Sequence, residues 1–321
     1  MIRAAHDLVR VACLVVLLGG AGCSAARGPM AYVGGMANDT VTVIDTATDR
    51  VAATILDVPQ PWSFAVSPDG ATVYVGGRGR TVSVIAAGSR TVVDRLDSGR
   101  VPQAVDASAD GRAVFVANAA DHTLSVISTT TRRLLARPEV GRLPVAVAAI
   151  PDRPAVYVAN YFAGTVSVVS MIDYTVAATI PVGDFPAALA LAPDGRHAYV
   201  TSQGAATVAV IDTRRDAVVA RIPVGAIPGG LATAPDGQWV YVANSGADTV
   251  SIISTATDRE VASIPVGRIP WGVAVTPDGR KIYITHQGED RVAVLDAAAR
   301  RVIGWIPLAA GGLSGVTIVP R

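Results

Sequence analysis

Apolar and polar residues alternate over short stretches along most of the chain, and turn-forming residues separate these stretches. A typical stretch is TVSII at residues 249–253, in which Val and Ile alternate with Thr and Ser. Such β-branched runs between Gly, Pro, Asp and Asn predict β-strands joined by tight turns. No helical periodicity follows the N-terminal segment, so the pattern predicts an all-β protein.

One strand motif occurs seven times. Its copies are AYVGG at Ala31, VYVGG at Val73, VFVAN at Val114, VYVAN at Val156, AYVTS at Ala198, VYVAN at Val240 and IYITH at Ile282, with neighbours 41 or 42 residues apart. Two further alternating stretches follow each copy, then a Gly- and Pro-containing turn and a fourth stretch before the next copy. A four-stranded unit of this length, repeated seven times, predicts a seven-bladed β-propeller of antiparallel blades over residues 31–321.

The two ends of the repeat region predict how the ring closes. The region begins at a copy of the strand motif, and residues 315–319 align with the fourth stretch of the other units. We therefore expect the C-terminal strand to pair beside residues 31–34 and complete the N-terminal blade. This pairing would remove an exposed sheet edge.

Several motifs resemble those of the YVTN-repeat β-propeller family. They are the YVAN copies, the TVSVID-like strands at Val41 and Val208, the IPVG turns at Ile180, Ile222 and Ile264, and the SPDG turn at Ser67. The resemblance covers residues 31–321. It implies a propeller similar in architecture to lactonase-type propellers, and an exported or surface-associated bacterial or archaeal protein. It implies no shared catalytic residues.

The N-terminus has the layout of a secretory signal. Arg3 and Arg10 precede an apolar run at residues 11–22, and small residues follow it. Cleavage before Cys23, in a segment that resembles a lipobox, would leave a signal peptide of residues 1–22, a lipidated Cys23 and a tether at residues 23–30. Cleavage after Ala26 is the alternative. The sequence thus predicts an exported protein, either anchored to the outer side of the cell membrane by a lipid or secreted.

Composition and charge argue against several classes of binding partner and cofactor. The chain has 27 basic and 26 acidic residues and no block of like charge, which argues against nucleic acid and against membrane contact other than the lipid anchor. Two Cys residues, of which Cys13 lies in the signal, leave no disulfide or Cys metal site. No cofactor motif occurs, and the three His residues outside the signal lie in separate repeats, so we expect no metal or cofactor. We expect a monomer.

Candidate ligand-binding residues are those at which one repeat differs from the others. Trp62 and Trp271 follow the turn before the fourth stretch of their units, and Gln103 is their equivalent in a third unit. Arg100 and Arg268 lie in the same turns, and we place Arg78, Arg80 and His286 in outer loops of the same face. Aromatic and polar side chains gathered on one arc of the mouth predict a binding site.

Asp106 stands where the other six units have Ala or Thr, so we expect a carboxylate near the central channel that is either a hydrogen-bonded structural group or faces a ligand. Asp106, His286 and Glu289 are the only weak candidates for acid–base catalysis. We therefore interpret the chain as a binding or scaffold protein for a protein, glycan or small ligand at the mouth. A propeller lactonase or lyase acting at the same mouth is the alternative.

Overall fold

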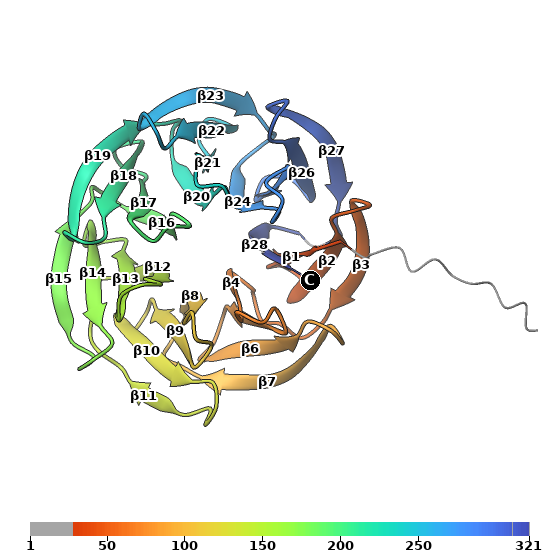
Figure 1. Cartoon of the computed structure of the whole chain (residues 1–321). Coiled ribbons are helices and arrows are strands. Elements are labelled where there is room, and N and C mark those ends of the chain that lie inside the picture. Colours follow the sequence, from red (N-terminus) through yellow and green to blue (C-terminus); the bar gives the residue numbers. More distant parts are fainter. Residues whose placement is uncertain (1–27, 310, 321) are drawn as a thin grey trace, which may run out of the picture.

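The computed structural model describes residues 28–309 and 311–320, and these residues form a ring of seven four-stranded antiparallel sheets (Figure 1). The signal, Cys23 and Ala26 lie outside the described residues. The first strand begins at Met30, one residue before the expected boundary. Within the described ranges the chain contains only strands and loops, and no helix that could cross a membrane. The predicted seven-bladed fold is confirmed.

Each blade runs from the central channel to the outside of the ring. The inner strands are β4 (Ser63–Val66), β8 (Pro102–Ala107), β12 (Pro144–Ala149), β16 (Pro186–Leu191), β20 (Pro228–Thr233), β24 (Pro270–Val275) and β28 (Leu313–Val319). The second strands are β1 (Met30–Gly35), β5 (Thr72–Gly76), β9 (Ala113–Asn118), β13 (Ala155–Asn160), β17 (His197–Ser202), β21 (Trp239–Asn244) and β25 (Lys281–His286). The third strands are β2 (Thr40–Asp45), β6 (Thr81–Ala86), β10 (Thr123–Ser128), β14 (Thr165–Ser170), β18 (Thr207–Asp212), β22 (Thr249–Ser254) and β26 (Arg291–Asp296). The outermost strands are β3 (Arg50–Ile55), β7 (Thr91–Asp97), β11 (Leu134–Ala136), β15 (Val176–Pro181), β19 (Ala217–Pro223), β23 (Arg259–Pro265) and β27 (Arg301–Pro307).

The ring closes through β28, as expected. In the register with β1, Ala31 lies opposite Ile318, Tyr32 opposite Thr317 and Val33 opposite Val316. The sheet order β28-β1-β2-β3 therefore joins a C-terminal strand to three N-terminal strands. Because every blade then has four strands, the ring has no incomplete blade at the point where the chain begins and ends.

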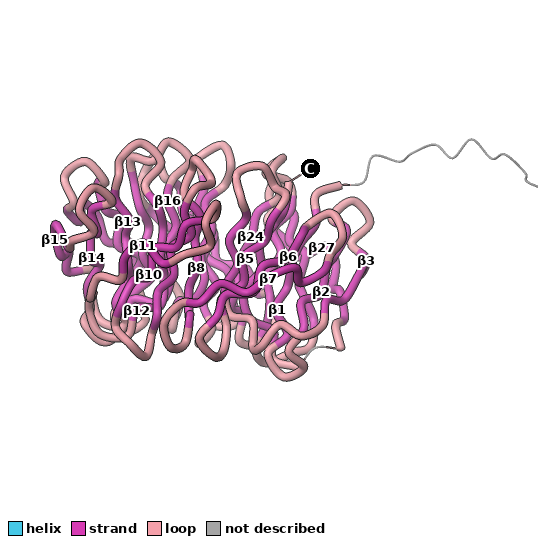
Figure 2. Tube along the Cα trace, turned by 90° about the horizontal axis from the view of Figure 1, so that it is seen from below, coloured by secondary structure: helices cyan, strands magenta, loops and turns pink. Residues whose placement is uncertain are grey.

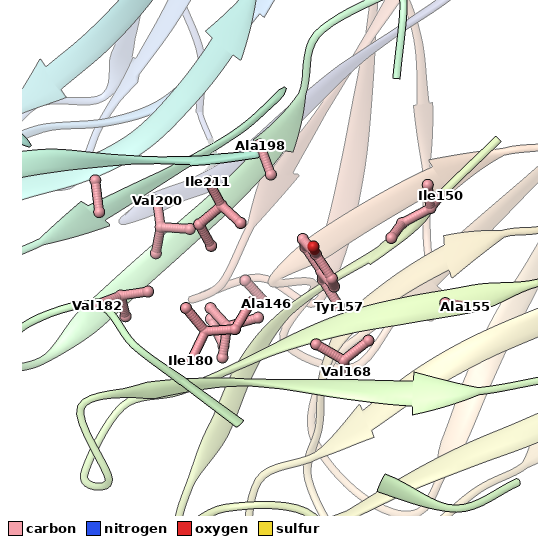
Figure 3. Close-up of a cluster of buried hydrophobic side chains, with 13 residues drawn as sticks. Ala146, Ile150, Ala155, Tyr157, Val168, Ile180, Val182, Ala198, Val200 and Ile211 are labelled. Atoms are coloured by element: carbon pink, nitrogen blue, oxygen red, sulfur yellow. The ribbon is translucent and has the colours of Figure 1, made fainter. Parts of the chain in front are cut away.

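The core lies between neighbouring blades. Figure 3 shows Tyr157 and Val168 of one blade beside Val200 and Ile211 of the next, and all four side chains are buried. The alternation within each strand explains this packing, because one face of every middle strand meets the preceding blade and the other face meets the following one. Seven such interfaces repeat around the ring.

The outermost strand of the third blade, β11, has three residues, whereas the other outermost strands have six or seven. Pro138 occupies the place that Ile222 and Ile264 hold in their units, and it cannot donate a hydrogen bond to the neighbouring strand. Beyond it, only an isolated bridge between Thr123 and Glu139 remains.

The loops gather at two opposite faces of the ring (Figure 2). The loop before an inner strand and the loop after the second strand share one face, because the amide of Ala119 donates to the carbonyl of Val101 at 2.9 Å. We call this the mouth face. On the opposite face, the turn after β2 lies beside the start of the described chain, where the amide of Thr46 donates to the carbonyl of Pro29 at 3.1 Å.

Candidate ligand-binding mouth

A cavity of about 460 Å³ occupies the mouth end of the central channel. Trp62, Gln103 and Trp271 line it, together with the first residues of the inner strands. Three of the residues expected at a binding site are thus brought together around one cavity. Its volume lies within the range of about 300–1,000 Å³ that is typical of small-molecule sites.

The two Trp residues lie on either side of β28. Trp62 is held through its backbone, because its amide donates to Gly76 at 2.8 Å and its carbonyl accepts from Gly315 at 3.1 Å. Trp271 packs over Gly229 of the preceding blade, where an added Cβ would lie 3.2 Å from the indole Cε3. The equivalents of Gly229 in the two preceding units are Val145 and Ala187. Gly229 therefore makes room for the indole.

Tyr161 and Gln203 also line the cavity, and the sequence analysis did not identify them. The Tyr161 hydroxyl donates to Oε1 of Gln203 at 3.0 Å, and the Tyr161 ring lies 5.2 Å from the ring of Phe185. Both residues directly follow the second strand of their blade, at a position that differs from repeat to repeat. That variation between repeats could have identified Tyr161 and Gln203 as candidate site residues from the sequence.

The Arg candidates lie on the mouth face but do not line the cavity. Arg100 forms an ion pair with Asp121 through Nε at 2.6 Å, and Arg78 lies 3.9 Å from Asp39. The amide and side chain of Arg100 both donate to Asp121 and lower the pKa of its carboxyl group. Arg80 and Arg268 are exposed in the same two kinds of loop.

The expected loop position of His286 is wrong. His286 ends β25 and is buried, with Nε2 at 2.7 Å from the carbonyl oxygen of Val266 and Nδ1 at 3.1 Å from that of Arg291. Burial lowers the pKa of its imidazole. It occupies the place of Asn118, Asn160 and Asn244, which also end a second strand, so aligning IYITH with VYVAN would have shown it.

Glu289 is engaged nearby and does not line the cavity. Its carboxylate accepts hydrogen bonds from Nε of Arg291 and from the amide of Arg268, and the bond from Arg291 is the main cause of a lowered pKa. The ring of Trp305 lies 5.7 Å from that of His286. His286 and Glu289 therefore belong to a packed cluster outside the cavity.

Asp106 lies on β8, also outside the lining of the cavity. Its Oδ2 accepts a hydrogen bond from the amide of Ala149 on the neighbouring inner strand at 2.8 Å. Burial raises the pKa of Asp106 to about 6, although this hydrogen bond opposes the shift. The carboxylate thus acts as a hydrogen-bond acceptor between two blades.

Apolar residues with positive φ surround the cavity. Val101, Leu143, Phe185, Ile227 and Ile269 precede the Pro of their turns and have φ of 50 to 57°. This left-handed region is unfavourable for residues other than Gly, and most of all for the β-branched Val101, Ile227 and Ile269. The carbonyl of each accepts a hydrogen bond from the loop after the second strand, for example from Tyr161 to Leu143 at 2.9 Å. The loops of the mouth face are thereby fixed to one another.

The cavity lining has no acidic, basic or His side chain among the described residues. In the same part of the chain, no group of three or more His, Cys, Asp or Glu could hold a metal ion. The arrangement offers aromatic rings, two amides, a phenol and backbone groups. It suits the binding of a ligand and does not bring the acid–base candidates to the cavity.

Comparison with known proteins agrees with this fold. Residues 139–238 match the family model of YNCE-like beta-propellers. A functionally unknown protein from Desulfotomaculum acetoxidans DSM 771 has a similar structure, with a TM-score of 0.80 and 17% identity over 91% of this chain and 99% of that one. Kuenenia stuttgartiensis hydrazine synthase gives a TM-score of 0.73 and 22% identity over 81% of this chain and 90% of that one. At these identities the solved structures show the fold alone.

No significant match was found among curated proteins. The family match and the structural likeness are consistent with a β-propeller of the YVTN type.

Proposed function

We propose that this propeller is an exported binding protein, anchored by a lipid on Cys23, that takes its ligand into the cavity at the mouth. The observation that carries the proposal is the 460 Å³ cavity, into which three repeats contribute Trp62, Gln103 and Trp271. Residues 1–26 support the export and the anchor, because an apolar run after two Arg residues leads to a small-residue segment with Cys23.

The repeats themselves support a specific site in the mouth. Residues that every blade shares maintain the fold, whereas the cavity contains the residues at which the blades differ. A ring of identical units would offer a symmetric mouth. Here the two Trp residues and the Tyr161–Gln203 pair face the cavity from different sectors, so the mouth can orient an asymmetric ligand.

No observation on the described residues supports the alternative function, a lactonase or lyase at the same mouth. Asp106, His286 and Glu289 lie outside the lining of the cavity, and each already contacts protein groups. Acid–base catalysis requires a group within hydrogen-bonding reach of the substrate, either directly or through one water molecule.

Trp62→Ala and Trp271→Ala test the binding function. Once a thermal-shift screen has found a ligand, we expect each variant to weaken binding by about 1–3 kcal/mol in calorimetry, because an aromatic side chain at a site contributes a large contact area. Melting temperatures should change little, because both side chains line the cavity and are only partly buried.

Trp239 and Trp305 provide matched controls. Arg300 lies over the ring of Trp239 at 5.0 Å, and Arg291 lies over Trp305 at 3.7 Å, both away from the cavity. Trp239→Ala and Trp305→Ala should leave the affinity unchanged. Equal losses in all four variants, or losses in the two controls alone, would contradict a site at the mouth.

A further inference from the structure

The chemistry of the mouth cavity indicates what kind of ligand it takes. Its polar side chains are Ser63, Gln103, Tyr161 and Gln203, and the described lining contains no Asp, Glu, Lys, Arg or His. An anionic ligand is normally met by Arg or Lys in its site, and a cationic one by a carboxylate. The charged residues of the mouth face lie outside the cavity, and Arg100 is already paired with Asp121.

The aromatic groups of the cavity are placed on both sides of a wall of small residues. Trp62 and Trp271 flank β28, whose residue Gly315 lines the cavity between them, and Gly272 follows Trp271. Val316 of β28 lines the cavity as well, so the wall between the two Trp residues is apolar. A ring with apolar faces fits against such a wall.

The polar side chains of the cavity can both donate and accept hydrogen bonds. The Tyr161 hydroxyl donates to Oε1 of Gln203, which leaves the NH₂ group of Gln203 and the lone pairs of the Tyr161 oxygen for a ligand. Within the described ranges the side chain of Gln103 makes no hydrogen bond, so its amide is available too.

The backbone of the inner strands is largely engaged within the protein. Every sheet ends at its inner strand, so one edge of each inner strand has no neighbouring strand within its own sheet and faces the channel. Near the mouth, several backbone groups of the inner strands are already bonded to a neighbouring blade. The amide of Gly315 donates to the carbonyl of Trp62, and the carbonyls of Gly229, Pro270 and Ser314 accept from side-chain hydroxyl groups. The side chains of the lining therefore provide the main polar groups for a ligand.

We propose that the mouth binds a neutral sugar ring, either free or at the end of a glycan, and this inference rests on the proposed binding function. Each hydroxyl of a sugar both donates and accepts a hydrogen bond, which matches amides and a phenol better than it matches charged groups. The C–H faces of the ring lie against Trp62 or Trp271. The absence of charge from the lining of the described residues selects against acidic sugars.

The test is calorimetric titration of the whole chain with neutral disaccharides of glucose, galactose, mannose and N-acetylglucosamine. Each disaccharide is compared with a matched disaccharide in which a uronic acid replaces the terminal sugar. We expect at least one neutral disaccharide to bind, and its uronate to bind at least about tenfold more weakly, because the carboxylate would enter a cavity without a cation. Raising NaCl from about 50 to 500 mM should leave the affinity for the neutral sugar unchanged, since no charge pair forms.

Gln103→Lys introduces a positive charge into the same cavity and provides a further check. The variant should weaken binding of the neutral disaccharide and strengthen binding of its uronate, which places the sugar next to Gln103. Binding of the protein to immobilised glycans that end in the same sugar distinguishes the two sources. If the natural ligand is the end of a glycan, the protein should bind the glycan at least as tightly as it binds the free sugar.

The outcomes separate the two proposals. The protein could prefer the uronate, or it could prefer an uncharged aromatic compound to every sugar. If Trp62→Ala and Trp271→Ala also weaken that binding, either result would overturn the neutral sugar and leave the mouth as the binding site. Sugar binding that is unaffected by both Trp variants and by Gln103→Lys would overturn the site itself. Binding of no disaccharide at millimolar concentration would overturn the sugar inference.

Discussion

At the scale of single residues, Asp106 is a carboxylate at a position where the other inner strands have Ala or Thr. Burial raises its pKa to about 6, so the native protein holds this proton more tightly than the unfolded chain does. Protonation of Asp106 therefore stabilises the native state at low pH, and the stabilisation is lost as the pH rises through about 6.

Asp106→Asn should remove this pH dependence while keeping an acceptor for the amide of Ala149. Between pH 4 and pH 7 we expect the free energy of unfolding of the native sequence to fall by about 2 kcal/mol relative to that of the variant. Urea unfolding of both proteins at the two pH values measures the difference. The contribution of His286 is common to both proteins and cancels. Parallel pH profiles would show that Asp106 titrates normally.

At the scale of elements, neighbouring blades are linked by a side-chain contact beside their apolar interface. The Tyr157 hydroxyl donates to Asp216 of the next blade at 2.5 Å, and Arg153 binds the same carboxylate through both terminal nitrogens. Tyr283 and Lys281 bind Asp49 in the same way, across the junction between the last blade and the N-terminal one. Asp258 has the equivalent place in another blade, but within the described ranges its side chain forms no hydrogen bond.

Asp216→Ala and Asp258→Ala form a matched pair. Loss of Asp216 leaves Tyr157 and the partly buried Arg153 without their partner, so we expect a loss of about 1–3 kcal/mol in the free energy of unfolding. Asp258→Ala should cost less than about 0.5 kcal/mol. Denaturant unfolding compares the two variants, and equal effects would show that the contact does not hold the blades together.

The closing strand β28 can be tested by truncation. Deletion of residues 313–321 removes every partner of β1 on the channel side and the apolar contacts of Val316 and Ile318, so we expect the melting temperature to fall by about 10 °C or more. Deletion of residues 320–321 alone keeps all pairs of β28 with β1 and is the control. A long truncation that melts within about a degree of the full chain would show that closure by β28 contributes little.

At the scale of the whole molecule, the blade number and the closing strand were predictable because each blade repeats one local pattern of strands and turns. Aligning IYITH with VYVAN would also have placed His286 at the end of its strand. The contacts of its ring with the carbonyl groups of Val266 and Arg291 were not predictable, because only the packed blade brings these groups together. Tyr161 and Gln203 were missed for a similar reason. Two loops of neighbouring blades had to be placed side by side before their contact was visible.

The lipid anchor has its own test. Cys23→Ala should abolish metabolic labelling with a fatty acid and release the protein from the membrane fraction, because the remaining chain offers no membrane-spanning helix among its described residues. Cell fractionation and labelling of the native sequence and the variant give the comparison. Unchanged membrane retention of the variant would rule out a lipid on Cys23 as the anchor.

The place where the described chain begins determines how an anchored protein would present itself. Gly28 and Pro29 lie beside the turn at Thr46, on the face away from the cavity. Four residues lie between Cys23 and Gly28, and the five residue steps from one to the other span at most about 18 Å in an extended chain. A lipid on Cys23 would therefore hold that face close to the bilayer, and the mouth face would point away from the membrane. In that orientation, a binding site at the mouth would be open to molecules too large to pass between the propeller and the membrane.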